Sequence, residues 1–184
     1  IEAASDWNIR CHVLDPDPDC SCSRLAWQFT CGSFKDYDAV MAFCADAHYI
    51  TIEIEHVNTD ALRDLKAQGK KVFPDPDMLD IIKDKGKQKS FYVEHGIPTS
   101  PFTLYDDADA IRQAVASGTR TLPFVQKSCT AGYDGKGVQV VRTKDDLDKL
   151  LPSASLAEEL IPFEKELAVI VARSTNGDTI AFPA

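Results

Sequence analysis

The sequence lacks several features that would place it in particular protein classes. Its longest apolar stretch, near Leu167 to Ala172, is far shorter than the ~20 residues that a membrane-spanning helix needs. No basic and then apolar leader opens the chain, and we see no internal repeat or low-complexity segment. We therefore predict a cytoplasmic protein with no membrane partner.

A zinc-binding cysteine pattern is also missing. Cys20 and Cys22 are spaced C-x-C, and no second pair or nearby histidine completes a set of four ligands. The six cysteines are therefore interpreted as reduced thiols of a cytosolic protein, and no metal site is predicted from them.

Positive charge is scarce. The formal net charge is −9 and no basic run is present, whereas non-specific nucleic-acid binding requires many lysines and arginines against phosphates. We predict no nucleic-acid partner. A small anion remains a suitable ligand, because its site needs only local positive charge.

What is present is an alternation of strand and helix patterns in the first half of the chain. Strands are expected at 10–14, 49–54 and 71–73, and helices at 36–44, 59–68, 77–82 and 85–95. Asn58 is a suitable N-cap for the helix at 59–68, and Gly69 a suitable residue to follow it. The pattern predicts an α/β layer with a parallel sheet.

The second half mixes strands and helices in an α+β pattern. Strands are expected at 102–104, 122–127, 138–142, 156–160, 167–173 and 179–182, and helices at 108–116 and from the cap Thr143 to about Leu150. Asn176-Gly177 predicts a hairpin turn. We place the domain boundary near residues 85–89 and predict domains at 1–88 and 89–184.

A glycine-rich turn is the most informative segment. Residues 126–137 read QKSCTAGYDGKG, with Lys127 at the end of one expected strand and Lys136 inside the turn. Free backbone N–H groups in such a turn can bind an anion, and the two lysines strengthen this interpretation over that of a plain hairpin. The spacing matches neither the Rossmann nor the Walker fingerprint, so a dinucleotide-binding oxidoreductase is the least favoured class.

Three further charged features accompany this turn. Lys85 and Lys89 share one helix face, although such runs are usually solvated. Glu53 and Glu55 end an expected strand, where ligands bind in open α/β sheets, although a strand end meeting water is the simpler interpretation. Glu158 and Glu159 end another strand, as exposed glutamates of a sheet edge also would.

In this order the features resemble a known family. The runs EIEHVN, IIKDKGKQKSFYVEHGIPTSPF, LPFVQKSCTAGYDGKGVQVV and LAEELIPFEKELAVIVAR are similar to the ATP-dependent N5-carboxyaminoimidazole ribonucleotide synthases. The resemblance covers about residues 9–184. It implies a Rossmann-like pre-ATP-grasp domain that lacks its first strand, followed by the N-terminal part of an ATP-grasp domain with its lid.

The resemblance also implies a reaction and its partners. ATP, bicarbonate and 5-aminoimidazole ribonucleotide would give N5-carboxyaminoimidazole ribonucleotide, ADP and phosphate through carboxyphosphate, in purine biosynthesis. Catalysis would consist mostly of positioning and charge neutralisation. Relatives are generally dimers, so a homodimer is expected.

The family pattern assigns roles to residues of this chain. Lys127 and Lys136 would be catalytic, and Glu53, Tyr133, Asp134 and Lys136 would bind the ribonucleotide, with Glu55 and His56 as alternatives to Glu53. ATP would be bound by Lys85, Lys127, Gly132, Tyr133, Asp134, Gly135, Lys136, Gly137, Val138, Glu158, Glu159, Leu160, Ile161 and Glu166.

Parts of the family pattern are missing. Ala131 stands where many relatives have glycine, which should stiffen the turn slightly. A first strand with its GQLGRM-like turn is expected before Ile1, and the Mg²⁺ ligands after Ala184. We therefore expect a piece of a longer enzyme that is inactive on its own.

Two alternatives stay open. Another ATP-grasp ligase, such as a glycinamide ribonucleotide transformylase or a biotin carboxylase, would share the fold and differ in its acceptor. A non-catalytic nucleotide-binding module would bind ATP without hydrolysis.

Overall fold

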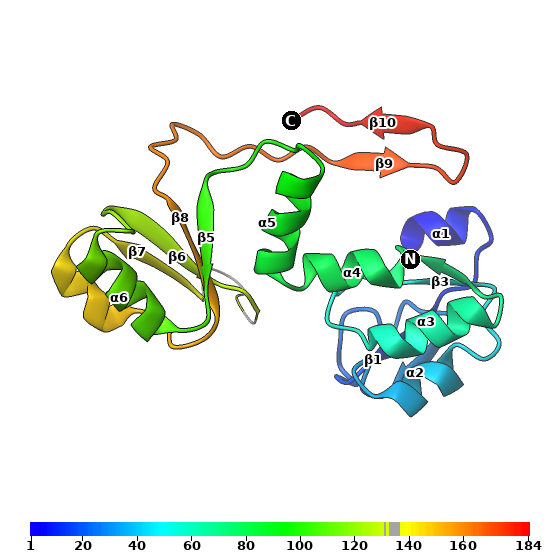
Figure 1. Cartoon of the computed structure of the whole chain (residues 1–184). Coiled ribbons are helices and arrows are strands. Elements are labelled where there is room, and N and C mark those ends of the chain that lie inside the picture. Colours follow the sequence, from blue (N-terminus) through cyan, green and yellow to red (C-terminus); the bar gives the residue numbers. More distant parts are fainter. Residues whose placement is uncertain (131, 133–136) are drawn as a thin grey trace.

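The computed structural model describes residues 1–130, 132 and 137–184 (Figure 1). Its N-terminal part contains α1 (Glu2–Asp6), β1 (His12–Asp15), β2 (Gln28–Cys31), α2 (Tyr37–Phe43), β3 (Tyr49–Thr51), α3 (Thr59–Ala67), β4 (Lys71–Phe73) and α4 (Pro76–Ile82). β1 pairs with β2 and β3 pairs with β4, both in parallel register. The expected parallel pairing is confirmed, although among the described residues it forms two separate pairs.

Helix α3 shows how the local sequence sets the structure. The Asn58 side chain accepts a hydrogen bond from the Ala61 N–H at 2.9 Å, and Gly69 follows the helix with a φ of 88°. Ala61, Leu62 and Leu65 are buried on one face. They pack with Val40, Cys44, Ile50, Val57, Val72 and Leu79 into the core of this part.

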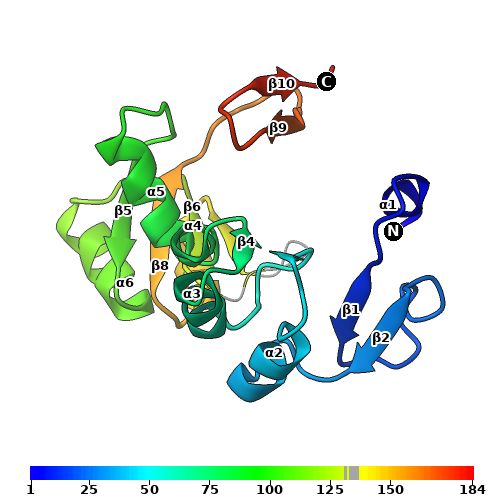
Figure 2. The same ribbon diagram turned by 90° about the vertical axis from the view of Figure 1, so that its right-hand side faces the viewer.

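Two strand predictions in this part were wrong. No strand was expected at Gln28–Cys31, where β2 lies beside β1 at one side of the molecule (Figure 2). The strand expected at 49–54 ends at Thr51, and residues 53–56 form a bend and a turn. Apolar residues such as Ile54 extended the strand pattern, but Ile54 is 40% exposed.

The C-terminal part is built on one antiparallel sheet. It contains α5 (Lys85–Glu94), β5 (Phe102–Tyr105), α6 (Ala108–Ser117), β6 (Phe124–Ser128), β7 (Val138–Val141), the 3₁₀ helix η1 (Lys144–Lys149) and β8 (Ser155–Glu159). The sheet has the order β5-β8-β6-β7, so β8 is a central strand. Figures 1 and 2 show α6 on one face of this sheet and α5 on the other.

A second core forms under α6. Ile111, Phe124, Val141 and Ala157 are fully buried there, with Ala108 and Leu150 beside them. This core fixes one face of β6 and β8, so that their other side chains face α5.

The chain continues into the hairpin of β9 (Val171–Arg173) and β10 (Thr179–Ala181), which both views show projecting beyond the four-stranded sheet (Figures 1 and 2). The hairpin predicted from Asn176-Gly177 is confirmed, with Gly177 at a φ of 96°. The strand expected at 167–173 is shorter than predicted and begins at Val171. None of the helices in the described part of the chain has the length and apolar character to cross a bilayer.

Candidate functional site

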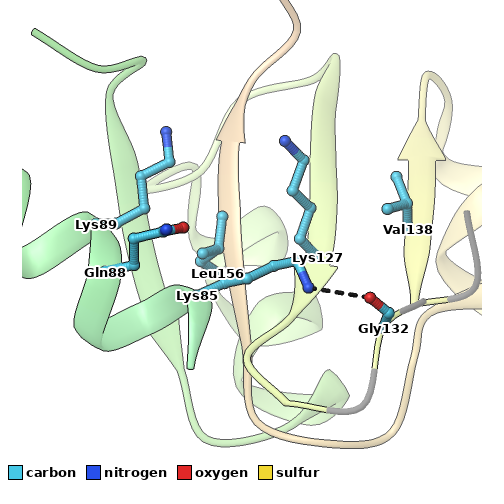
Figure 3. Close-up of a pocket in the computed structure, with 7 residues that line it drawn as sticks. All are labelled: Lys85, Gln88, Lys89, Lys127, Gly132, Val138 and Leu156. Atoms are coloured by element: carbon cyan, nitrogen blue, oxygen red, sulfur yellow. Dashed lines mark hydrogen bonds between the residues drawn. The ribbon is translucent and has the colours of Figure 1, made fainter. Parts of the chain in front are cut away.

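A cavity of about 330 Å³ lies between α5 and the sheet. It is lined by Lys85, Gln88 and Lys89 of α5, Lys127 of β6, Gly132, Val138 of β7 and Leu156 of β8 (Figure 3). Three lysines therefore line one small volume, a concentration of positive charge that suits an anion.

Helix α5 is fixed at its first turn by a cap. The Asp84 carboxylate accepts hydrogen bonds from the N–H groups of Gly86 at 2.8 Å and Lys87 at 3.1 Å. The helix therefore begins at Lys85, and the i, i+3, i+4 spacing places Lys85, Gln88 and Lys89 on the face toward the cavity.

The start of α5 lies close to the end of β6. The Lys85 N–H donates to the Cys129 carbonyl at 2.8 Å. Gly86 is buried, and a Cβ there would lie 3.1 Å from the Cys129 Sγ and from Leu104 Cδ2. A glycine at this position lets the lysine-bearing helix approach the sheet.

The floor of the cavity follows from strand register. Along β6, Phe124, Gln126 and Ser128 are buried in the core direction, so Lys127 points to the other face. Lys127 is paired with Val138 on β7 and with Leu156 on β8. These three cavity residues are therefore neighbours across three adjacent strands.

Glu158 is buried beside this floor and bridges two of the lysines. Its side chain is 8% exposed; Oε2 pairs with Lys89 Nζ at 2.8 Å, and Oε1 pairs with Lys127 Nζ. Ser100 Oγ also donates to Oε2, at 2.9 Å. Burial raises the pKa of Glu158, but the hydrogen bonds from Lys127, Lys89 and Ser100 outweigh it and hold the pKa below its ordinary value.

The two described glycines of the turn lie against each other. Gly137 has a φ of 84°, and a Cβ there would come within 2.9 Å of the Gly132 Cα. The Gly137 carbonyl accepts from the Ser128 N–H at 2.8 Å, and the Gly132 carbonyl accepts from Lys85 Nζ at 3.3 Å (Figure 3). The base of the turn is therefore closed and tied to α5.

The structure brings together several residues that the sequence indicated. Lys85, Lys127, Gly132 and Val138 line the cavity, Gly137 contacts Gly132, and Glu158 pairs with Lys127. The predicted residues Tyr133, Asp134, Gly135 and Lys136 lie outside the described residues, as does Ala131.

Other predicted residues do not line this cavity. Glu159 ends β8 with an exposed side chain, Leu160 and Ile161 follow it, and Glu166 is exposed further along. Glu53 lies in the bend after β3, not at a strand end, and is exposed. Their ligand roles stay predictions.

Sequence reasoning missed Gln88, Lys89 and Leu156 as cavity residues. The lysine run at 85–89 was interpreted as a solvent-exposed helix face. This interpretation is wrong for Lys89, whose side chain is only 14% exposed. The edge interpretation of Glu158 is also wrong, because β8 is central and Glu158 is buried. The i, i+4 spacing of Lys85 and Lys89 was the available signal.

The donors of this site suit a polyanion. Ammonium groups and turn backbone around a small cavity can hold phosphate oxygens. Within residues 1–130, 132 and 137–184, no three histidine, cysteine, aspartate or glutamate side chains gather where they could hold a metal ion.

Models of two protein families match the chain. The ribonucleotide synthetase preATP-grasp domain matches residues 1–83, and the ATP-grasp domain matches residues 90–184. The chain belongs to the ATP-grasp family. Its fold is a Rossmann-like pre-ATP-grasp layer followed by ATP-grasp elements, as the sequence resemblance implied.

Curated relatives are similar along the whole chain. Phosphoribosylaminoimidazole carboxylase of Ogataea methanolica is 35% identical over 100% of this chain and 35% of its own length. N5-carboxyaminoimidazole ribonucleotide synthase of Synechococcus elongatus is 34% identical over 98% of this chain and 46% of its own length. The chain thus spans between a third and a half of these relatives.

Solved structures agree with this chain in fold. N5-carboxyaminoimidazole ribonucleotide synthetase from Thermotoga maritima has a TM-score of 0.85 and 30% identity, over 98% of this chain and 47% of that one. The enzyme from Aspergillus clavatus, in complex with ADP and 5-aminoimidazole ribonucleotide, has a TM-score of 0.80 and 27% identity, over 99% of this chain and 48% of that one. The predicted family resemblance is confirmed.

Proposed function

We propose that this chain is the nucleotide-binding part of an ATP-dependent carbon–nitrogen ligase that carboxylates 5-aminoimidazole ribonucleotide in purine biosynthesis. The observation that carries the proposal is the cavity lined by Lys85, Lys89, Lys127 and Gly132. Relatives of this chain that are named for this activity match it along 98 to 100% of its length.

The cavity would receive the phosphates of ATP. Lys127 is one-third exposed and has one hydrogen-bonding partner among the described residues, so two of its three N–H groups are available to phosphate oxygens. Lys85 would hold a phosphate beside the Gly132 carbonyl that it already contacts. Residues 132–138 would form the loop over the phosphates, with Lys136 as a second catalytic cation.

The adenine and ribose would lie along the residues that follow β8. Backbone groups of residues 158–161 would bind the adenine edge, and Glu166 a ribose hydroxyl. Glu158, near the end of β8, pairs with the cavity residue Lys127, so it would connect the phosphate side of the site to the adenine side.

The chemistry would proceed in two displacements. A bicarbonate oxygen attacks the γ-phosphorus, forming a new O–P bond as the bond to ADP breaks. The exocyclic amine of the ribonucleotide then attacks the carbon of carboxyphosphate, the C–O bond to phosphate breaks, and the amine loses a proton. Lysines stabilise the negative charge that develops on the phosphoryl oxygens.

The ribonucleotide would bind through Glu53, Tyr133, Asp134 and Lys136, with Glu55 and His56 as alternatives to Glu53. In the structure His56 Nε2 lies 3.5 Å from Glu55 Oε1, so these two side chains already interact. The assignment of these residues to the ribonucleotide rests on the family pattern.

Mg²⁺ would accompany ATP. The residues of the cavity do not fit a Mg²⁺ site, because Mg²⁺ prefers carboxylate oxygens and Glu158 is occupied by two lysines and Ser100.

We further propose a division at residues 88 and 89, a cytoplasmic location and a homodimer. Separate hydrophobic cores before and after α5 support the division. The net charge of −9 supports a protein without a nucleic-acid partner. Sedimentation equilibrium would test the dimer.

The test is ADP release by the full-length protein that contains this sequence, with Mg·ATP, bicarbonate and one acceptor at a time. We expect stimulation by 5-aminoimidazole ribonucleotide and none by glycinamide ribonucleotide or biotin. Stimulation by glycinamide ribonucleotide or biotin would leave the assignment to the ATP-grasp family intact but would show that the proposed acceptor is wrong. ATP binding without ADP release under any condition would indicate a non-catalytic module.

A further inference from the structure

Lys89 lines the cavity but has no donor left for a ligand. Its Nζ donates to Thr99 Oγ1 at 2.6 Å and to Ser100 Oγ at 2.8 Å, and pairs with Glu158 Oε2 at 2.8 Å. A protonated lysine has three N–H donors, and these three acceptors use all of them. The side chain is also only 14% exposed.

Lys127 differs from Lys89 in both respects. It is 33% exposed, and its hydrogen-bonding partner within the described part of the chain is Glu158 Oε1. With respect to the described residues, Lys127 therefore keeps free donors, and it lines the cavity (Figure 3). The donors of Lys89 are all used by Thr99, Ser100 and Glu158.

Glu158 connects the two lysines. One carboxylate accepts from Lys89 at one oxygen and from Lys127 at the other. The two lysines carry two positive charges and Glu158 carries one negative charge, so the three side chains together have a net charge of about +1. Without Lys89, the Glu158 charge would be balanced by Lys127 alone, and this net charge would vanish.

We propose that Lys89 is a positioning residue for phosphate binding: it holds Glu158 and offsets its charge, so that Lys127 remains available to the phosphates of a nucleotide. This inference rests on the proposed function, since it assumes that the cavity binds ATP. It assigns Lys89 a part in ATP binding although Lys89 touches no phosphate.

A purely structural role would differ in what it affects. Lys89 also links α5 to the segment before β5, through Thr99 and Ser100, and its ammonium lies 5.7 Å from the Phe102 ring centroid. If Lys89 served only as this structural link, its loss would lower the stability of the fold and would weaken the binding of adenosine, ADP and ATP by the same factor. An electrostatic role changes affinity only where the ligand carries phosphates.

The experiment measures dissociation constants of adenosine, ADP and ATP by calorimetry, for the full-length protein that contains this sequence and for its variants. In Lys89→Met we expect ADP and ATP affinity to fall about tenfold while adenosine affinity changes less than about twofold. Lys89→Arg should restore most of the loss, because it restores the charge. The matched control is Lys87→Met, which removes an exposed charge from the same helix.

A double variant keeps the test decisive if Lys89→Met is destabilised. Adding Glu158→Gln removes the uncompensated negative charge, so the ratio of ADP affinity to adenosine affinity should return toward that of the wild type. Equal losses for adenosine and ADP, or a Lys89→Met that binds like Lys87→Met, would overturn the inference. A wild-type protein that binds neither ADP nor ATP would overturn the proposed function as well.

Discussion

The ammonium group of Lys127 pairs with the buried carboxylate of Glu158 across the neighbouring strands β6 and β8. Lys127 lines the cavity, and Glu158 lies buried beside it on β8, the strand that precedes the residues we propose for adenine binding.

Replacing Lys127 with alanine should weaken ATP binding. A hydrogen bond to a charged group contributes about 1.5 to 3 kcal/mol, so we expect the dissociation constant to rise about ten- to a hundredfold. Calorimetry on the variant checks this. Lys144→Ala removes an exposed lysine of η1 and should leave the constant unchanged. Equal constants for both variants would contradict a phosphate role for Lys127.

Glu158 should contribute stability that depends on pH. Its pKa is held below the ordinary value of 4.5, so the contribution is present above about pH 4.5 and is lost as pH falls through the folded-state pKa. Glu158→Gln should lower the free energy of unfolding by about 1 to 3 kcal/mol at pH 7, and by progressively less in acid.

Urea unfolding at several pH values measures this dependence. Glu159→Gln is the matched control, because Glu159 is the next residue of β8 but is exposed. A stability difference between Glu158→Gln and wild type that stays constant from neutral pH into acid would contradict the account.

Gly137→Ala should disturb the base of the turn. An alanine at a φ of 84° is strained by roughly 1 to 2 kcal/mol, and its Cβ would in addition meet the Gly132 Cα at 2.9 Å. We expect a lower melting temperature and weaker ATP binding. Gly118 has a similar φ of 79°, but an added Cβ there would meet no atom within 4 Å. Gly118→Ala should therefore lower the melting temperature through backbone strain and leave ATP binding unchanged.

Asp146 should stabilise η1 in a pH-dependent way. Its carboxylate accepts from the Arg142 and Thr143 N–H groups and pairs with Lys149, which lowers its pKa from 3.8 to about 2. The contribution is present above pH 3.8 and is lost as pH falls toward about 2.

We therefore expect Asp146→Asn to lower the urea midpoint at pH 7, and the difference from wild type to narrow in acid. Asp145→Asn is the control in the same turn, since the Asp145 side chain makes no hydrogen bond to any described residue. A midpoint unchanged by Asp146→Asn at pH 7 would show that the cap does not stabilise the fold.

The helices were predictable because their signals are local. Asn58, Asp84 and Thr143 each stand just before a helix, and the apolar spacing of α3 shows which face is buried. The strand β2 was not predictable in this way. Its residues Gln28–Cys31 have no clean alternation, and the strand exists through its pairing with β1.

Site residues were predictable where the local sequence already indicated a ligand-binding role. Lys127 and the glycines stood out beside a turn, whereas Lys89 looked like part of a solvated charge run. Its burial depends on Glu158 and Thr99, which lie 69 and 10 residues away in the sequence and meet it only in the folded chain. Long-range pairing of this kind has no local signal.

Oxygen transfer from bicarbonate to phosphate is the most direct test of the proposed ATP-dependent carboxylation. The full-length protein would be given ¹⁸O-labelled bicarbonate, Mg·ATP and 5-aminoimidazole ribonucleotide, and the released phosphate analysed by mass spectrometry. Attack of bicarbonate on the γ-phosphorus predicts one ¹⁸O atom in each phosphate released, with more phosphate released when the ribonucleotide is present. Phosphate that carries oxygen from water alone would contradict the account.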